Sequence, residues 1–135
     1  MTNTPLGQIL WTDLTVNDAE GVRDFYKAVL GWTSEEIEME GYADYMMIAP
    51  HHMARPTEGP ARIAGICHAR GANAELPAQW LNYFGVENIE TACKAVTRLK
   101  GKLVTDIRTY GASKFCVIED PAGAVCALFE NKEEG

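Results

Sequence analysis

Asp13 and His68 are the residues of this sequence whose types and surroundings best suit acid–base chemistry. Asp13 lies in the alternating segment 10–16, where a carboxylate that points inward must be solvated, paired or functional. His68 ends a predicted strand, and an imidazole can give or take a proton near neutral pH. A histidine at a strand end also commonly serves as a structural hydrogen-bonding group. The sequence offers four cations as partners of Asp13, namely Arg62, Arg70, Arg108 and Lys114.

Segment 10–32, LWTDLTVNDAEGVRDFYKAVLGW, predicts the strand, turn and helix that would position Asp13. Strand alternation directs one set of side chains toward a helix and directs the other set, Trp11, Asp13 and Thr15, to the opposite surface. Asn17 and Asp18 form an N-cap pair, because short side-chain oxygens accept hydrogen bonds from the free amides of a first helical turn. We therefore expect a helix that begins there and ends at Leu30, before Gly31 as a left-handed C-cap.

The second half of the chain repeats this pattern at a distance of 70 residues. Segment 80–88 matches 10–18 with its alternation and its cap pair in register, and Gly101 takes the place of Gly31. Each copy is too small to bury its own apolar face, so the two copies are expected to share one domain. Coincidence is the alternative, because the order strand, cap, helix and glycine recurs in many α/β chains.

The remaining apolar runs complete each half as βαβββ. We expect first-half strands at 32–38, 44–49 and 62–68. In the second half we expect a strand at 79–86, a helix at 88–100 and strands at 102–106, 114–119 and 124–130, with a turn at 109–111. The sequence thus predicts a single α+β domain of two tandem modules, at about 8–68 and 79–130, joined by a linker at 69–78. Segment 51–60, which contains His51 and His52, is predicted to be an exposed loop.

Length and composition limit the class of protein. A chain of 135 residues with 47% hydrophobic content fits one compact domain. The net charge of −7 argues against a general nucleic-acid surface. No apolar run approaches the roughly 20 residues of a membrane span, and no signal-peptide pattern opens the sequence. We therefore expect a cytoplasmic protein with neither a nucleic-acid nor a membrane partner.

The four cysteines are predicted to be reduced core residues. They have no CxxC spacing and lie in apolar contexts. This pattern favours free thiols over a disulfide or a zinc site at Cys67, Cys93, Cys116 and Cys126.

Two motifs give this tandem arrangement a family resemblance. D-x3-V-x2-FY-x3-LGW at 18–32 and DPAG at 120–123 resemble the vicinal oxygen chelate superfamily, which contains glyoxalase I, bleomycin resistance proteins and extradiol dioxygenases. The resemblance covers about residues 8–130, and two further segments, GICHARGANAELP and WLNYFGVEN, are similar to small glyoxalase-like proteins without an assigned reaction. The resemblance implies that the curled sheets of the two modules surround a shared cleft.

The resemblance also implies where a metal would be held. Metal-using members place one ligand on the first strand and one on the last strand of each module. In this sequence those positions fall on Trp11, Leu81, Ala127 and approximately Gly65. A divalent site needs about three to four N, O or S donors within roughly 2.0 to 2.6 Å of the ion. We therefore expect neither the superfamily metal site nor a cofactor.

Strand alternation places five residues in the cleft that the resemblance implies. They are Trp11, Asp13, Thr15, Leu81 and Tyr83. An apolar, aromatic surface with a few polar anchors is typical of sites for small organic ligands. Alternatively, Trp11 and Tyr83 plug the cleft as core residues.

Three functions stay open at this point. The chain is expected first to bind a small organic molecule without metal. The second function is a lyase, isomerase or dioxygenase that acts on a small carbonyl or aromatic compound. Such an enzyme would use Asp13 and His68 as acid and base, or unorthodox metal ligands among Asp13, His68 and Glu130. The third is a dimeric structural or interaction protein in which the cleft is plugged and the formation of a homodimer is the main role.

Overall fold

A computed structural model describes residues 5–50 and 61–131 of the chain. The described residues group into two compact units. The first-half unit comprises Thr12–Trp80, and the second-half unit comprises Leu81–Gly135 together with Met1–Trp11. The predicted loop 51–60, with His51 and His52, lies outside the described residues.

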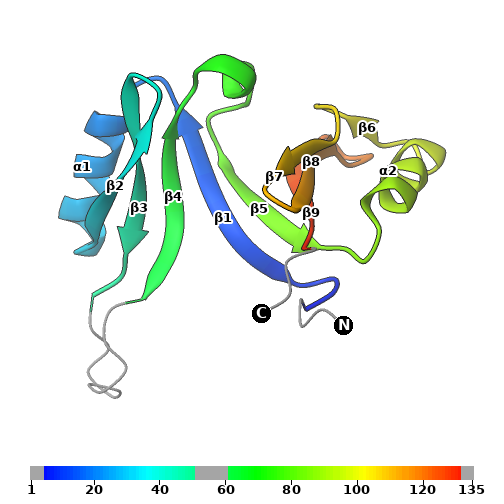
Figure 1. The fold of residues 1–135 in the computed structure, drawn as a ribbon, viewed down its shortest axis with the longest axis horizontal. Coiled ribbons are helices and arrows are strands. Elements are labelled where there is room, and N and C mark those ends of the chain that lie inside the picture. Colours follow the sequence, from blue (N-terminus) through cyan, green and yellow to red (C-terminus); the bar gives the residue numbers. More distant parts are fainter. Residues whose placement is uncertain (1–4, 51–60, 132–135) are drawn as a thin grey trace. The chain divides into compact units, whose positions relative to one another are not determined.

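The first-half unit is a four-stranded mixed sheet with one helix on one of its faces (Figure 1). Its elements are β1 (Ile9–Val16), α1 (Ala19–Leu30), β2 (Thr33–Met39), β3 (Tyr42–Ile48) and β4 (Arg62–His68). The strand order is β2-β3-β4-β1, with β1 and β4 parallel and the other pairs antiparallel. β2 is therefore an edge strand of this unit.

Both ends of α1 follow from local chemistry. The Asp18 side chain accepts a hydrogen bond from the Gly21 amide at 3.0 Å. Gly31 adopts a φ of 72°, which glycine tolerates and other residues rarely do. The predictions for the start and the end of this helix are confirmed. The core between helix and sheet buries Leu14, Ala19, Tyr45, Met47, Ala64 and Ile66.

The second-half unit has the same plan with one additional short strand. Its elements are β5 (Trp80–Gly85), α2 (Ile89–Arg98), β6 (Lys102–Leu103), β7 (Arg108–Tyr110), β8 (Ser113–Glu119) and β9 (Val125–Glu130). The strand order is β5-β9-β8-β6, and β7 also pairs with β8. The core under α2 buries Ile89, Cys93, Cys116, Ile118 and Leu128. β6 lies at the free end of this strand order.

Two groups fasten the start of α2. Asn88 accepts a hydrogen bond from the Thr91 amide at 2.8 Å, as the predicted cap pair requires. Glu130, at the far end of β9, accepts a second bond from the Ile89 amide at 2.7 Å. The second contact comes from a residue 41 positions away, so a local pattern does not reveal it.

The predicted strand 102–106 and turn 109–111 are partly wrong. The amides of Val104 and Thr105 both donate to the Val117 carbonyl, at 2.8 and 3.2 Å, so the regular ladder stops after Leu103. The chain pairs with β8 again at Arg108–Tyr110, and only Gly111 turns with a positive φ. The apolar pattern predicted an extended segment but not this interruption.

Gly101 differs from its predicted counterpart Gly31. The left-handed residue after α2 is Lys100, with a φ of 73°. A Cβ at Gly101 would lie 2.8 Å from the Glu119 carbonyl oxygen and 2.8 Å from a Val96 methyl group. Gly101 therefore allows a close approach of α2 to β8.

Two further features concern the linker and the helices. The linker contains a short 3-10 helix, Gly71–Asn73. Within the two described ranges, no helix combines the length and the apolar character that a bilayer crossing requires.

Candidate functional site

The face of the first-half sheet opposite α1, called here the helix-free face, carries the predicted residues Asp13 and Thr15. Asp13 pairs with Gly65 and Thr15 with Cys67 across the parallel strands β1 and β4. The alternate residues Leu14 and Ile66 lie in the core with α1. Because successive side chains of a strand point to opposite faces, the polar residues lie away from the helix, as predicted.

The Asp13 carboxylate lies directly over Gly65. A Cβ placed on Gly65 would overlap Asp13 Oδ1, and the next nearest group is the Cys67 sulfur at 3.8 Å. Glycine on β4 thus makes room for an acidic side chain from β1. The superfamily position near Gly65 has no side chain of its own, and the neighbouring strand fills its space with a carboxylate.

Asp44 on β3 is a buried acceptor beside this position that sequence reasoning missed. It is 7% exposed. Its Oδ1 accepts a hydrogen bond from the His68 amide at 2.8 Å and lies 3.4 Å from His68 Nδ1. The Cys67 thiol also hydrogen-bonds to Asp44. One carboxylate therefore organises the last two residues of β4. In the sequence, the only sign of this role was that an acidic residue opens the otherwise apolar run DYMMIA.

Aromatic and cationic groups surround His68. The Tyr42 ring meets the imidazole edge-on, with centroids 5.6 Å apart, and Tyr45 lies at 6.1 Å. The Arg70 guanidinium lies over the Tyr42 ring, 4.2 Å from its centroid. His68 is thus held between a carboxylate and two phenol rings. This arrangement can orient the imidazole for hydrogen bonding or for proton transfer.

Alkaline pH should destabilise the protein through Cys67. Burial, and then the charges of Asp13 and Asp44, raise the pKa of this thiol above the ordinary 9.0. Above about pH 9 the unfolded chain loses the proton first, so the free energy of unfolding falls by at most about 1.4 kcal/mol per pH unit for this group. Urea unfolding of the wild type and of Cys67→Ala below and above that pH measures this slope. An unchanged slope in the variant would rule out Cys67 as its source.

The other predicted ligand contacts belong to the second-half unit. Leu81 and Ala127 are fully buried. Tyr83 pairs with Ala127 in register, and its ring lies 6.3 Å from that of Phe115. Trp11 is half-buried. Their contact with a ligand stays a prediction.

The structure gives three of the four candidate partners of Asp13 other contacts. Arg62 makes a two-bond ion pair with Glu35, each bond 2.9 Å long. Lys114 pairs with Glu90 at 2.8 Å, and Arg70 stacks on Tyr42. These three cations thus have partners of their own, and the pairing of Asp13 with a cation stays a prediction.

The residues at the superfamily metal positions do not fit a metal ion. A divalent cation binds nitrogen, oxygen or sulfur donors. The side chains at these positions supply none, since they are the indole of Trp11, the isobutyl group of Leu81, the methyl group of Ala127 and the hydrogen of Gly65. The acidic residue named as a substitute, Glu130, binds the Ile89 amide instead. Across residues 5–50 and 61–131, no group of three or more His, Cys, Asp or Glu side chains is arranged to hold a metal.

Comparisons with known proteins agree with this architecture. The family model "Glyoxalase/Bleomycin resistance protein/Dioxygenase superfamily" matches residues 8–128. The anthracycline biosynthesis protein DnrV of Streptomyces peucetius is 26% identical over 140 residues, which cover 96% of this chain and 49% of DnrV. The putative glyoxylase CFP32 of Mycobacterium tuberculosis is 23% identical, over 92% of this chain and 44% of its own length. The chain thus spans about half the length of these curated relatives.

Solved structures confirm the fold class. A variant of Streptomyces coelicolor methylmalonyl-CoA epimerase, in complex with 2-nitronate-propionyl-CoA, matches with a TM-score of 0.57 and 15% identity. That match covers 96% of this chain and all of the other. A glyoxalase/bleomycin resistance protein/dioxygenase superfamily member from Vibrio splendidus matches with a TM-score of 0.55 and 14% identity, over 90% and 97% of the two chains. At these identities the likeness shows the fold alone, and the predicted α+β fold of tandem βαβββ modules is confirmed.

Proposed function

Because this chain belongs to the glyoxalase/bleomycin resistance protein/dioxygenase superfamily, we propose that it binds a small organic molecule without the superfamily metal. The polar anchor of this site is Asp13 on the helix-free face of the first-half sheet. Trp11, Thr15, Leu81 and Tyr83 stay the further proposed contacts. A cytoplasmic location is part of the proposal, in keeping with four free thiols.

The observation that carries the proposal is the Asp13 carboxylate over Gly65. A glycine in a strand interior weakens the strand, so its presence often marks the close approach of another group. Here that group is an acid, and a second acid, Asp44, lies beside the same strand. Two carboxylates favour a ligand that presents hydrogen-bond donors, such as hydroxyl or amino groups, rather than an anion.

The relative DnrV indicates one chemical class to test first. Its name places that protein in anthracycline biosynthesis. An anthracycline combines aromatic rings with hydroxyl and amino groups, the features that carboxylates and aromatic side chains recognise. We therefore choose an anthracycline as the first probe, together with simple phenols.

The contact of Asp44 with His68 favours a second candidate function, an acid–base enzyme that acts on a small carbonyl compound. A carboxylate beside Nδ1 favours the neutral tautomer that carries its proton there, so Nε2 can accept a proton from a substrate. His68 would then be the base and Asp44 its positioning residue.

Metal analysis and ligand titration of tag-free protein test the proposal. We expect no stoichiometric metal and no change in melting temperature on adding EDTA or divalent cations. Binding of the anthracycline or of a phenol should raise the melting temperature and change tryptophan fluorescence. Asp13→Asn and Gly65→Ala should each weaken binding about tenfold or more. The first loses the charge, and in the second the new methyl group displaces the flexible carboxylate.

Glu75→Gln, which neutralises an exposed carboxylate on the linker, is the matched control and should bind like the wild type. A stoichiometric metal whose stabilising effect disappears in Asp13→Ala would overturn the metal-free proposal. Equal ligand affinity in the wild type, Asp13→Asn and Gly65→Ala would show that any binding occurs elsewhere.

A further inference from the structure

The helix-free face continues from Asp13 across β4 and β3 to the edge strand β2. Asp13 pairs in register with Gly65, and Gly65 pairs with Met46 on β3. Met46 in turn pairs with Glu35 on β2. Residues that pair in register lie on the same face of a sheet. Met46, which is half-buried, is therefore the first side chain that follows Gly65 in the direction of β2.

The neighbouring positions of β2 add exposed apolar side chains to this face. Ile37 pairs with Asp44, whereas Glu36 pairs with Tyr45, which lies in the core with α1. Because neighbours along a strand point to opposite faces, Ile37 and Met39 lie on the helix-free face. They are 40% and 39% exposed, and together with the residue on β3 they form a patch rather than isolated apolar side chains. This patch, called here the apolar shelf, comprises Met46, Ile37 and Met39.

The charged groups around the apolar shelf are unevenly arranged. At its outer edge, the Glu35 carboxylate is neutralised by two hydrogen bonds from Arg62, each 2.9 Å long. On the inner side, the Asp13 carboxylate lies over Gly65, and Asp44 directs its Oδ1 toward the end of β4. The surface thus has two carboxylates on the side of β4, and an apolar area that ends at a neutralised ion pair on the side of β2.

The width of the sheet sets the length of a ligand that covers this surface. Neighbouring strands lie about 4.8 Å apart, so β4 and β2, two spacings apart, are separated by about 10 Å. A single aromatic ring that binds the Asp13 carboxylate over β4 reaches Met46 but is too short to reach Ile37. A fused system of about three or four rings spans both spacings and covers the shelf as far as β2.

On the basis of the proposed function, we infer that the ligand is a polycyclic compound whose donor group binds Asp13 and whose far rings lie on the apolar shelf. Such rings remove the apolar surface of Ile37 and Met39 from water. Met46 contributes a thioether, which packs favourably against aromatic rings. Met46 and Ile37 are then the residues that determine the size of the ligand.

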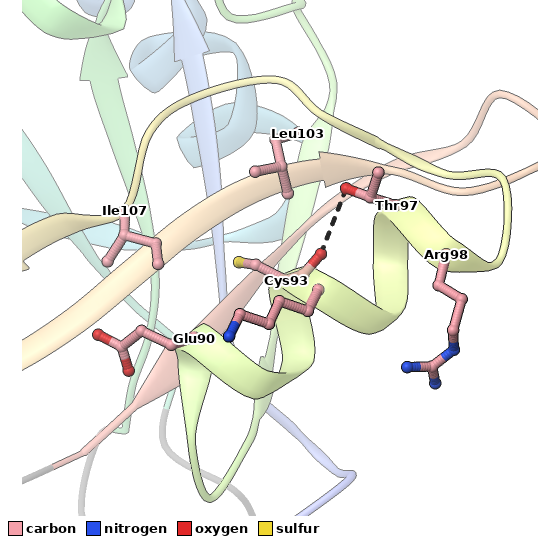
Figure 2. A pocket seen from close by; sticks show the side chains of 7 residues that line it. Glu90, Cys93, Thr97, Arg98, Leu103 and Ile107 are labelled. Atoms are coloured by element: carbon pink, nitrogen blue, oxygen red, sulfur yellow. Dashed lines mark hydrogen bonds between the residues drawn. The ribbon is translucent and has the colours of Figure 1, made fainter.

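A second apolar surface, in the second-half unit, provides a comparison for this assignment. A hollow of about 600 Å³ lies beside α2, which lines it with Glu90, Lys94 and Arg98, and Leu103 faces them from β6 (Figure 2). Glu90 binds Lys114 at 2.8 Å, so the cations are the prominent charges of the lining. A ligand that presents hydrogen-bond donors fits carboxylates better than cations, which favours the shelf over the hollow.

A series of hydroxylated aromatic compounds tests the inference with the whole, tag-free chain. Titration calorimetry with phenol, a naphthol and an anthracycline should show affinity that rises with the number of rings. Ile37→Ser should weaken anthracycline binding about tenfold and leave phenol binding unchanged, because only the longer ring system reaches β2. Met46→Ser should weaken the binding of both compounds, since its side chain lies next to Gly65.

Two exposed apolar residues outside the shelf supply matched controls. Val29→Ser changes the outer surface of α1, and Leu103→Ser changes the hollow beside α2; these side chains are 59% and 44% exposed. Both variants should bind all three compounds like the wild type. The melting temperature of each unliganded variant shows whether it is folded. A loss of anthracycline affinity in Leu103→Ser as large as in Ile37→Ser would overturn the inference.

The inference and the proposed function fail in different ways. If anthracycline binding were unchanged in Ile37→Ser and Met46→Ser but weakened in Asp13→Asn, the inference would be overturned and the proposed function would stand. Equal affinity of the wild type for phenol and for the anthracycline would have the same meaning. A wild type that binds none of the three compounds, or binding that Asp13→Asn leaves unchanged, would overturn both.

Discussion

Replacing Glu130 by alanine should lower the free energy of unfolding by about 2–4 kcal/mol. Glu130 is 2% exposed, and its Oε1 accepts a 2.7 Å hydrogen bond from the Ile89 amide at the start of α2. Its loss leaves a buried amide without this acceptor, and it removes a negative group from the positive end of the helix dipole. It also removes the cross-strand neighbour of Lys114, whose pKa is raised first by its hydrogen bond with Glu90.

Glu130→Gln separates these effects, because the amide oxygen keeps the hydrogen bond while the charge is lost. We expect Glu130→Gln to lose about 1–2 kcal/mol, less than Glu130→Ala. Urea unfolding followed by circular dichroism measures both losses. If Glu130→Ala were as stable as the wild type, the free-energy cost of burying the carboxylate would equal the gain from its hydrogen bond with the Ile89 amide. Glu130 would then not be what stabilises the start of α2.

Replacing Asp44 by alanine should cost about 2–3 kcal/mol, because a buried acceptor of the His68 amide and of the Cys67 thiol is lost. Asp44→Asn should lower the free energy of unfolding by less than Asp44→Ala, but it should change the protonation of both His68 and Cys67. The pKa of Cys67 should fall toward its ordinary value, since the charge of Asp44 and its hydrogen bond both raise that pKa. Burial, the largest cause, remains. Alkylation of Cys67 should therefore be faster in Asp44→Asn than in the wild type at the same pH.

The tautomer of His68 provides a second measurement on the same variant. In the wild type we expect the neutral imidazole to carry its proton on Nδ1, facing Asp44, and in Asp44→Asn we expect a mixture of both tautomers. Nitrogen-15 chemical shifts distinguish the two forms. Cys126 is the internal control, because burial and then Asp120 raise its pKa, so its alkylation rate should not change. A wild-type imidazole protonated on Nε2 would contradict the positioning role of Asp44.

Local sequence patterns predicted the elements whose boundaries depend on neighbouring residues. Asp18 reaches an amide three residues away, and Gly31 adopts a positive φ directly after α1. The alternation of β1 placed Leu14 in the core and Asp13 on the other face. The strand predicted at 62–68 is β4 to the residue. In each case the cause acts within one turn of helix or along one strand, so it is visible in a short window of sequence.

Local patterns failed where a distant segment decides the conformation. The Val117 carbonyl accepts hydrogen bonds from both amides that would have continued β6. The Glu119 carbonyl leaves no room for a side chain at Gly101, and the left-handed residue after α2 is Lys100. Sequence reasoning also missed the contact of His68 with Asp44, which the antiparallel register of β3 and β4 creates.

The amino-acid order therefore specified the βαβββ modules, the capped helices and the face on which Asp13 lies, because propensity, capping and alternation act over a few residues. The contacts of Asp44 with His68, of Asp13 with Gly65 and of Glu130 with Ile89 depend on strand register and helix packing. Those contacts join residues 24 to 52 positions apart, and a polar side chain has several acceptable partners at such distances. The choice among these partners is made only when the sheets form.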